Sequence, residues 1–368
     1  MSSMNNSIIY NLNLNFELLD EKSKNIEKTN QKIDKDAFLV RKEKEIYTKK
    51  SQSNISSRNN EELLFHIRKK DNVYKLESPI PKKNNYQTDD IIKTLENKLW
   101  VILNSENKDK YEHPLFESDI IRIGNFKFII NEIYLNSDNS DIGISNGKND
   151  YDNVNMDSEE IFIKIPEIKK FKDCKFCDTF NISFCECNNL IHYKCFEKYI
   201  NKIIEKNKNE NIKKNKNENT TVKCYSIDNF NCKYCFMPYP VRFSKQNSKE
   251  VYNAIPIEIP QESNYIILES LGHKKENNTI KTLYVINLKE DIITIGRNNN
   301  NDIIIDDSSI GEEHAIIKFD RKNNKIILQS VNNKFDSAVL IKKSLIMNEK
   351  KIYLQTRNTK FEANLNKV

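Results

Sequence analysis

The sequence predicts a multidomain protein that is mainly β, with a β-sandwich at the C-terminus, a small α+β finger held by metal, and a disordered N-terminus. Three observations carry this prediction. Short runs of β-branched and aromatic residues recur after residue 265, seven cysteines and one histidine form four close pairs, and the first 90 residues are rich in Asn, Lys and Glu. A length of 368 residues fits two or three domains.

Residues 1–90 form a segment that we expect to be low in complexity and largely disordered. Only 38% of the chain is hydrophobic, and Asn and Lys are over-represented. A segment with few apolar residues cannot bury enough surface to offset the entropy that is lost on ordering. Isolated patches such as EELLFHIRKK (61–70) have a helix-like pattern.

The charge balance and the absence of targeting signals narrow the class of protein. The net charge is +6, from 59 basic and 53 acidic residues, which is too small and too dispersed an excess to imply a nucleic-acid partner. The N-terminus lacks the pattern of a signal peptide, and no run approaches the roughly 18 apolar residues of a spanning helix. We therefore expect an intracellular protein, cytoplasmic or nuclear, whose thiols stay reduced.

Residues 95–137 are predicted to form a small β module. KLWVILNS (97–104) and SDIIRIGNFKFIINEIYL (118–135) are short and β-branched, and Trp100 is expected in the core. SDIIRIG (118–124) matches EDIITIG (290–296) at five of seven positions. This weak repeat indicates either shared ancestry of the two β regions or chance in an Ile-rich chain.

The four close pairs predict two structural zinc ions between residues 168 and 242. Zinc takes four Cys or His ligands in a tetrahedron, and C-x2-C turns bring two thiolates to one ion. A disulfide framework needs an oxidising compartment, and a nucleophile needs one activated thiol rather than four pairs. Cys224 is left over. The eight predicted ligands are Cys174, Cys177, Cys185, Cys187, His192, Cys195, Cys232 and Cys235.

A helix is predicted directly after Cys195. Apolar residues lie on one helical face there, and a low-complexity insert at 205–222 follows as a flexible loop. The residues of the apolar face are Phe196, Tyr199, Ile200, Ile203 and Ile204.

The C4HC3 order and the aromatic helix resemble the RING-CH zinc finger, which folds as a cross-brace. The resemblance implies that Cys174, Cys177, His192 and Cys195 hold one zinc ion and the other four ligands hold the second. Many members are E3 ubiquitin ligases, in which Phe176 and Tyr199 would contact an E2~ubiquitin conjugate. The four residues before His192, and Phe230 two residues before Cys232, also resemble a PHD finger, which reads histone tails.

Residues 262–366 carry about eight strand patterns and are predicted to form a β-sandwich. IGRNNNNDIIIDDSSIGEEHAIIKF (295–319) resembles an FHA domain, an eleven-stranded sandwich that binds phosphothreonine peptides. The order of finger and sandwich resembles protist proteins that combine a RING-CH finger with an FHA domain, and 95–137 would be a degenerate FHA-like relative. The resemblance gives Arg297 the phosphate-contacting role and His314 a bracing role, and a guanidinium fork suits a phosphate.

Other positions of the FHA pocket depart from the family pattern. The family serine corresponds to Gly311, its neighbour to Glu312, and the family Asn and Gly to Phe335 and Asp336. Ser309 or Ser308 is a candidate replacement for the lost hydroxyl. Asp306, Asp307, Glu312, Glu313 and Asp336 would surround a phosphate that carries about −1.5 to −2 charges.

Three functional hypotheses follow from the sequence. The first is an E3-ligase-like protein whose finger recruits E2~ubiquitin and whose FHA domain selects a substrate. The second is a non-enzymatic scaffold that binds phosphothreonine or unmodified peptides through degenerate sites. The third is a PHD-like chromatin reader. Two structural zinc ions are common to all three, and protein partners are expected in each.

Overall fold

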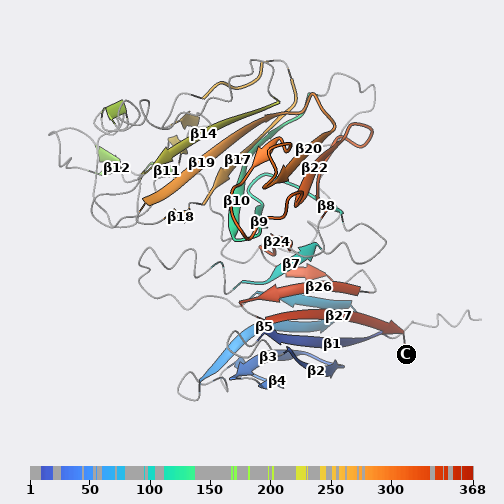
Figure 1. Cartoon of the computed structure of the whole chain (residues 1–368). Coiled ribbons are helices and arrows are strands. Elements are labelled where there is room, and N and C mark those ends of the chain that lie inside the picture. The colour runs from blue at the N-terminus through green and yellow to red at the C-terminus, as the bar shows by residue number, and fades with distance from the viewer. Residues whose placement is uncertain are drawn as a thin grey trace, which may run out of the picture. The chain divides into compact units, whose positions relative to one another are not determined.

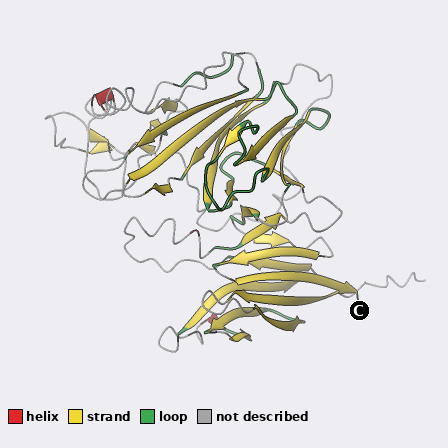
Figure 2. Cartoon of the chain, in the orientation of Figure 1, coloured by secondary structure: helices red, strands yellow, loops and turns green. Residues whose placement is uncertain are grey.

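The computed structural model of the chain describes somewhat more than half of its residues, and almost all of these lie in strands or the turns that join them (Figures 1 and 2). The described residues are 10–19, 26–43, 45–52, 55, 60–70, 73–78, 95, 98–103, 112–136, 167–168, 170–171, 181–182, 198, 201–202, 221–228, 230, 241–245, 251–253, 257–261, 263–271, 273–275, 278–331, 336–342, 344–346, 351–357 and 359–367. The chain divides into two compact units: unit 1 comprises residues 1–113, 121–124 and 329–368, and unit 2 comprises 114–120 and 125–328.

Unit 1 contains two antiparallel sheets. The first has the order β9-β24-β7-β26-β27-β1-β2, and the second has the order β25-β6-β5-β3-β4. The strands of the first sheet are β9 (Ile120–Ile123), β24 (Ser337–Leu340), β7 (Trp100–Leu103), β26 (Lys351–Thr356), β27 (Thr359–Lys367), β1 (Tyr10–Leu19) and β2 (Ile26–Ile33). Those of the second are β25 (Ser344–Ile346), β6 (Val73–Glu77), β5 (Glu61–Lys70), β3 (Ala37–Lys42) and β4 (Glu45–Lys49).

The two sheets of unit 1 face each other across an apolar core. Leu12 and Leu14 of β1 are fully buried, as are Phe65 of β5 and Ala363 of β27. The ring of Phe65 lies 5.0 Å from the ring of Phe361, so the two sheets make direct contact. This is the packing of a β-sandwich, in which alternate residues of each strand fill the space between the sheets.

The N-terminal segment differs from the expectation of disorder. β1 has the sequence YNLNLNFELL, in which Leu12 and Leu14 are buried while Asn13 and Asn15 remain partly exposed. EELLFHIRKK, expected to be helix-like, is β5, paired with β3 and β6. In β1, the alternation of polar and apolar residues in NLNLNF (11–16) lets a segment of low overall hydrophobicity still cover one face of a sheet.

Unit 2 contains one sheet segment of order β14-β19-β17-β10 and most of a sheet of order β21-β20-β22-β23-β8, of which Glu112, His113, Gln329 and Ser330 belong to unit 1. The strands of the first are β14 (Val222–Asp228), β19 (Asn278–Asn287), β17 (Tyr265–Ser270) and β10 (Phe126–Tyr134), with β18 (His273–Lys275) beside β19. Those of the second are β21 (Ile303–Ile304), β20 (Ile292–Gly296), β22 (Ala315–Asp320), β23 (Lys325–Ser330) and β8 (Glu112–Pro114). Every residue of β17 is buried, so this strand is covered on both faces.

The predicted module at 95–137 does not form a region of its own. β7 pairs with β24 and β26, and β9 pairs with β24, all within unit 1. β10, by contrast, pairs with β17 in unit 2. The strands of the predicted sandwich at 262–366 are likewise divided, because β17–β22 lie in unit 2 and β24–β27 in unit 1. Backbone hydrogen bonds between distant segments decide this division, and local sequence patterns do not encode them.

Candidate functional site

The predicted metal ligands lie outside the described residues, and so do Phe176 and Tyr199. Short strands frame this region. β12 (Lys170–Phe171) pairs with β13 (Asn181–Ile182), so the Cys174–Cys177 pair lies in the connection of a hairpin. Among the described residues, which include none of the eight ligands, no group of His, Cys, Asp or Glu could hold a metal ion.

The two ends of the predicted finger are joined by a further small sheet. β11 (Glu167–Ile168) runs parallel to β15 (Arg242–Lys245), which pairs with β16 (Val251–Asn253). Lys198, Asn201 and Lys202 are helical and exposed, and they fall between the apolar positions of the predicted helix.

Part of the predicted finger belongs instead to the sheet of unit 2. β14 pairs with β19 along its whole length, so the connection between Cys195 and Cys232 is not only low-complexity insert. Cys224 lies in β14, and burial raises the pKa of its thiol, although hydrogen bonds from Ser226 and Tyr284 oppose the shift. Phe230, which carried the PHD resemblance, is buried.

The loops that the FHA resemblance assigns to the phosphopeptide lie together at one end of β20 and β22. We call residues 297–302 the Arg297 loop and residues 305–314 the Ser309 loop. Two backbone hydrogen bonds join them: the Arg297 N–H donates to the Gly311 carbonyl at 2.8 Å, and the Asn298 N–H donates to the Glu312 carbonyl at 3.2 Å. The Ile305 N–H donates to the Gly296 carbonyl at 2.9 Å. The backbone of both loops is therefore held in place without help from a ligand.

Asn301 strengthens the junction of the two loops. Its side-chain Nδ2 donates to the Asn298 carbonyl at 2.8 Å and to the Glu312 carbonyl at 2.7 Å. The side chain is buried, and Gly296 packs directly against it. Asn301 was not among the residues singled out from the sequence, because it is one of four consecutive asparagines in RNNNNDI (297–303) with no local signal to distinguish it.

His314 braces the start of β22. Its N–H donates to the Ile295 carbonyl at 2.8 Å, and its Nδ1 accepts a hydrogen bond from the Gly311 N–H at 3.1 Å. Nδ1 can accept only when it carries no proton, so the neutral ring has its proton on Nε2. The side chain is fully buried, and its role is structural.

Arg297 presents its side chain to solvent. The residue is exposed, and its guanidinium makes no hydrogen bond or ion pair with any residue that the structure describes. Its backbone is anchored to Gly311, so the base of the side chain is fixed while the charged end is available. An arginine in this state can form two parallel hydrogen bonds to a phosphate.

Ser309 lies in the neighbouring loop and is partly exposed. Its N–H donates to Asp307 Oδ1 at 2.8 Å, and its Oγ accepts a hydrogen bond from the Asn125 N–H at 3.0 Å. Because the oxygen accepts, the hydroxyl proton can be donated to another group. Gly311 is buried and contributes backbone groups only.

Two of the five carboxylates that the sequence assigned to the surroundings of the site have partners of their own. Asp336, counted among the repelling charges, is paired with Lys360 in unit 1. Asp307 accepts from the Ser309 N–H. Asp306, Glu312 and Glu313 remain exposed in the Ser309 loop.

Comparison with known families identifies an FHA domain at residues 293–356. The match contains Arg297, Asn301, Ser309, Gly311 and His314, and it indicates a protein-interaction module of the phosphopeptide-binding kind. No RING-CH finger is detected. Comparison with curated proteins and with solved structures finds no match. Among the described residues, no helix has the length and apolar character to span a membrane.

Proposed function

We propose that this chain binds phosphothreonine peptides through Arg297 and Ser309. The observation that carries the proposal is the guanidinium of Arg297, which is exposed and unpaired among the described residues while its backbone is anchored to the Ser309 loop. Ser309 supplies a hydroxyl proton in place of the serine that the FHA pattern has at the position of Gly311. Charge-assisted hydrogen bonds of this kind are worth roughly 1.5–3 kcal/mol each.

The affinity of such a site is low. Arg297 is one cation, and Asp306, Glu312 and Glu313 are exposed in the loop beside it. Like charges a few ångströms apart at the surface cost on the order of 1–4 kcal/mol before salt screening. We expect dissociation constants in the high micromolar to millimolar range, which correspond to about −4 to −6 kcal/mol.

A titration with a phosphothreonine peptide library at low salt tests the proposal. Arg297→Ala is expected to abolish the preference for phosphorylated over unphosphorylated peptides. Arg321→Ala is the matched control, since Arg321 is an exposed arginine paired with Asp291 at the other end of β22. Equal binding of phosphorylated and unphosphorylated peptides by the wild type would remove the proposed function and leave a scaffold that recognises unmodified peptides.

A second candidate function concerns the cysteine region. We propose that it binds two zinc ions in the cross-brace pairing and recruits E2~ubiquitin through Phe176 and Tyr199. The C4HC3 order supports this, as do the β12–β13 hairpin around the first cysteine pair and the β11–β15 pairing that closes the ends. Ubiquitin discharge from an E2 panel by the full chain, compared with Phe176→Ala, is the test. Failure with every E2 favours the non-enzymatic scaffold, whereas binding of histone tails favours the PHD-like reader.

A further inference from the structure

The backbone N–H that donates a hydrogen bond to Ser309 belongs to Asn125, which lies outside the matched FHA domain. Asn125 follows β9 and directly precedes β10, 184 positions before Ser309 in the chain. The segment is well anchored in unit 2. The Leu115 N–H donates to the Ile326 carbonyl at 2.8 Å, the Ser118 N–H donates to the Ile130 carbonyl at 2.7 Å, and β10 pairs with β17.

Only the backbone of Asn125 is used in the contact with Ser309. Its N–H donates to Ser309 Oγ at 3.0 Å, whereas its side chain is exposed and makes no hydrogen bond with any described residue. An exposed side-chain amide beside a phosphate-contacting hydroxyl offers two donors and one acceptor. These are the groups that pair with the main chain of an extended peptide.

We propose that Asn125 is a peptide-contacting residue of the Arg297 site and that its amide binds the main chain of the peptide beside the phosphothreonine. The inference rests on the proposed function of this site. The family match lacks side-chain donors at Gly311 and has Phe335 where the FHA resemblance implies an asparagine. Asn125 would supply an amide from a different part of the chain.

The distances allow one peptide to reach both residues. The Arg297 N–H is 2.8 Å from the Gly311 carbonyl, and Ser309 precedes Gly311 by two residues. Two residues span at most about 7 Å, and an extended peptide rises about 3.3 Å per residue. A peptide whose phosphate is held by Arg297 therefore brings its next two to four residues within reach of Asn125.

A simpler reading makes Asn125 only a turn residue. Gly124 has a φ of 57° and begins the turn between β9 and β10, in which asparagine is common. That reading predicts that loss of the amide changes stability and leaves peptide affinity unchanged. Our proposal predicts the reverse, because Asn125→Ala keeps the N–H that binds Ser309.

The experiment uses the full chain and a phosphothreonine peptide that the wild type binds. Asn125→Ala is expected to weaken binding about five-fold, the effect of one hydrogen bond, without changing the unfolding midpoint. Asn125→Asp should weaken binding further, because a carboxylate cannot donate and repels the phosphate. Asn324→Gly is the matched control: it removes an exposed asparagine at the far end of β22, and its φ of 50° tolerates glycine.

The outcomes separate this inference from the proposed function. If the wild type binds no phosphothreonine peptide, the proposed function fails and the inference falls with it. If the wild type binds and Arg297→Ala does not, while both Asn125 variants bind as the wild type does, only the inference is wrong.

Discussion

Gly296 lies where the Arg297 loop and the Ser309 loop approach each other most closely. A Cβ at this position would collide with the Glu312 carbonyl oxygen and lie 2.7 Å from Asn301 Nδ2. Both are parts of the junction that holds Arg297, and a backbone carbonyl cannot move away cheaply. The glycine is therefore required for space and not for its backbone conformation, since its φ is not positive.

Gly296→Ala is expected to destabilise the protein by about 2–3 kcal/mol, the upper part of the range for overpacking in a well-packed site. It should also remove peptide binding, because the Glu312 carbonyl would lose its bonds to Asn298 and Asn301. Urea denaturation and peptide titration measure the two effects. Lys322→Ala, at an exposed position of the turn after β22, should change neither. Wild-type stability for Gly296→Ala would contradict the close approach.

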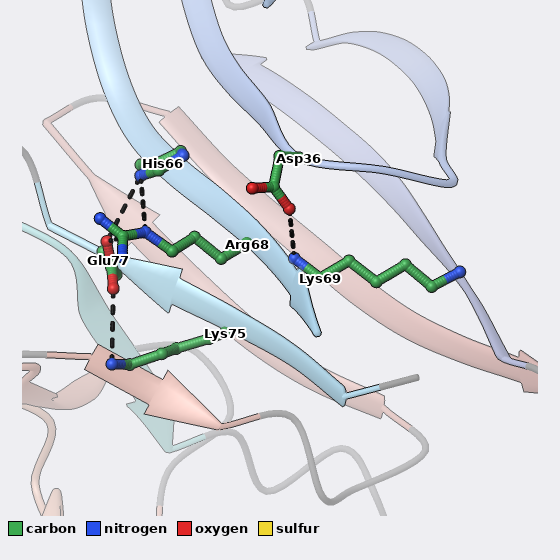
Figure 3. A network of polar contacts seen from close by, with 6 residues as sticks. All are labelled: Asp36, His66, Arg68, Lys69, Lys75 and Glu77. Atoms are coloured by element: carbon green, nitrogen blue, oxygen red, sulfur yellow. Dashed lines mark hydrogen bonds and ion pairs between the residues drawn. The ribbon is translucent and has the colours of Figure 1, made fainter. Parts of the chain in front are cut away.

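His66 is the centre of a polar cluster on the second sheet of unit 1 (Figure 3). Its ring stacks on Phe38, with centroids 4.1 Å apart. Its Nδ1 is 3.3 Å from Glu77 Oε2, and Arg68 Nε is 3.0 Å from the same oxygen. Burial lowers the pKa of His66, with a further contribution from Arg68, although Glu77 and Asp36 act in the opposite direction.

The lowered pKa of His66 predicts a loss of stability in acid. Since the unfolded histidine has a pKa near 6.5, the unfolded state takes up a proton first as the pH falls below that value. The contribution of neutral His66 is thus complete above about pH 6.5 and declines below it. Unfolding free energies at pH 7.5 and 5.5 should fall more for the wild type than for His66→Gln. An identical pH dependence for both proteins would show that His66 keeps its ordinary pKa.

At the scale of the element, β1 is the clearest case of a strand that composition conceals. It pairs with β27 from Tyr10 to Leu18 and with β2 from Leu12 to Leu19. Its outward face carries a polar ladder, in which Asn15 Nδ2 donates to Glu362 Oε1 at 3.3 Å and Asn30 Nδ2 donates to Asn15 Oδ1 at 2.7 Å. Asn13 and Asn15 on one face and Leu12 and Leu14 on the other give this part of the strand a low average hydrophobicity.

Leu14→Ala should cost about 3 kcal/mol, because Leu14 is fully buried in unit 1. Asn13→Ala, at the neighbouring outward position, should cost less than about 0.5 kcal/mol. Chemical denaturation measures both, and amide exchange should show protection in β1. If Leu14→Ala is as stable as Asn13→Ala, β1 contributes nothing to the apolar core, and the disorder that the sequence predicts for this segment holds.

At the scale of the whole molecule, Cys232 and Cys235 lie in the sequence between two buried residues of unit 2, Phe230 and Val241. Val241 is buried, and its N–H donates to Glu269 Oε1 at 3.2 Å, the carboxylate that also pairs with Lys281. Phe230 is buried before Cys232. A zinc ion bound by Cys232 and Cys235 would therefore crosslink a segment whose two ends are packed in unit 2.

The full chain is expected to bind two zinc ions, measured by elemental analysis of the purified protein. Cys232→Ser should lower the content to one or less, because it removes one ligand of a four-ligand site. Cys224→Ser should leave two ions bound, since Cys224 lies in β14 and has a raised pKa. A chelator should release the zinc and reduce the unfolding midpoint. A content of zero in protein purified without chelator would overturn the cross-brace prediction.

Short-range motifs made part of the candidate site predictable. Arg297 follows Gly296 directly, and His314 precedes β22 directly, so one stretch of sequence carries both. Asn301 and Asn125 were not predictable, because their roles depend on partners 11 and 184 positions away. The acidic surroundings were overestimated for the same reason, since the partner of Asp336 is Lys360 on another strand.

The sequence by itself predicted that the chain is mainly β and that an FHA-like sandwich lies at residues 262–366, because alternation and loop motifs are local properties. Comparison with known families finds the FHA domain at residues 293–356. The sequence did not determine which strands are neighbours. Only the tertiary structure paired β24 with β7 and β9, and β1 with β27. Backbone hydrogen bonds are the same for every residue type, so the choice of partner strand depends on how the buried faces pack across the whole fold.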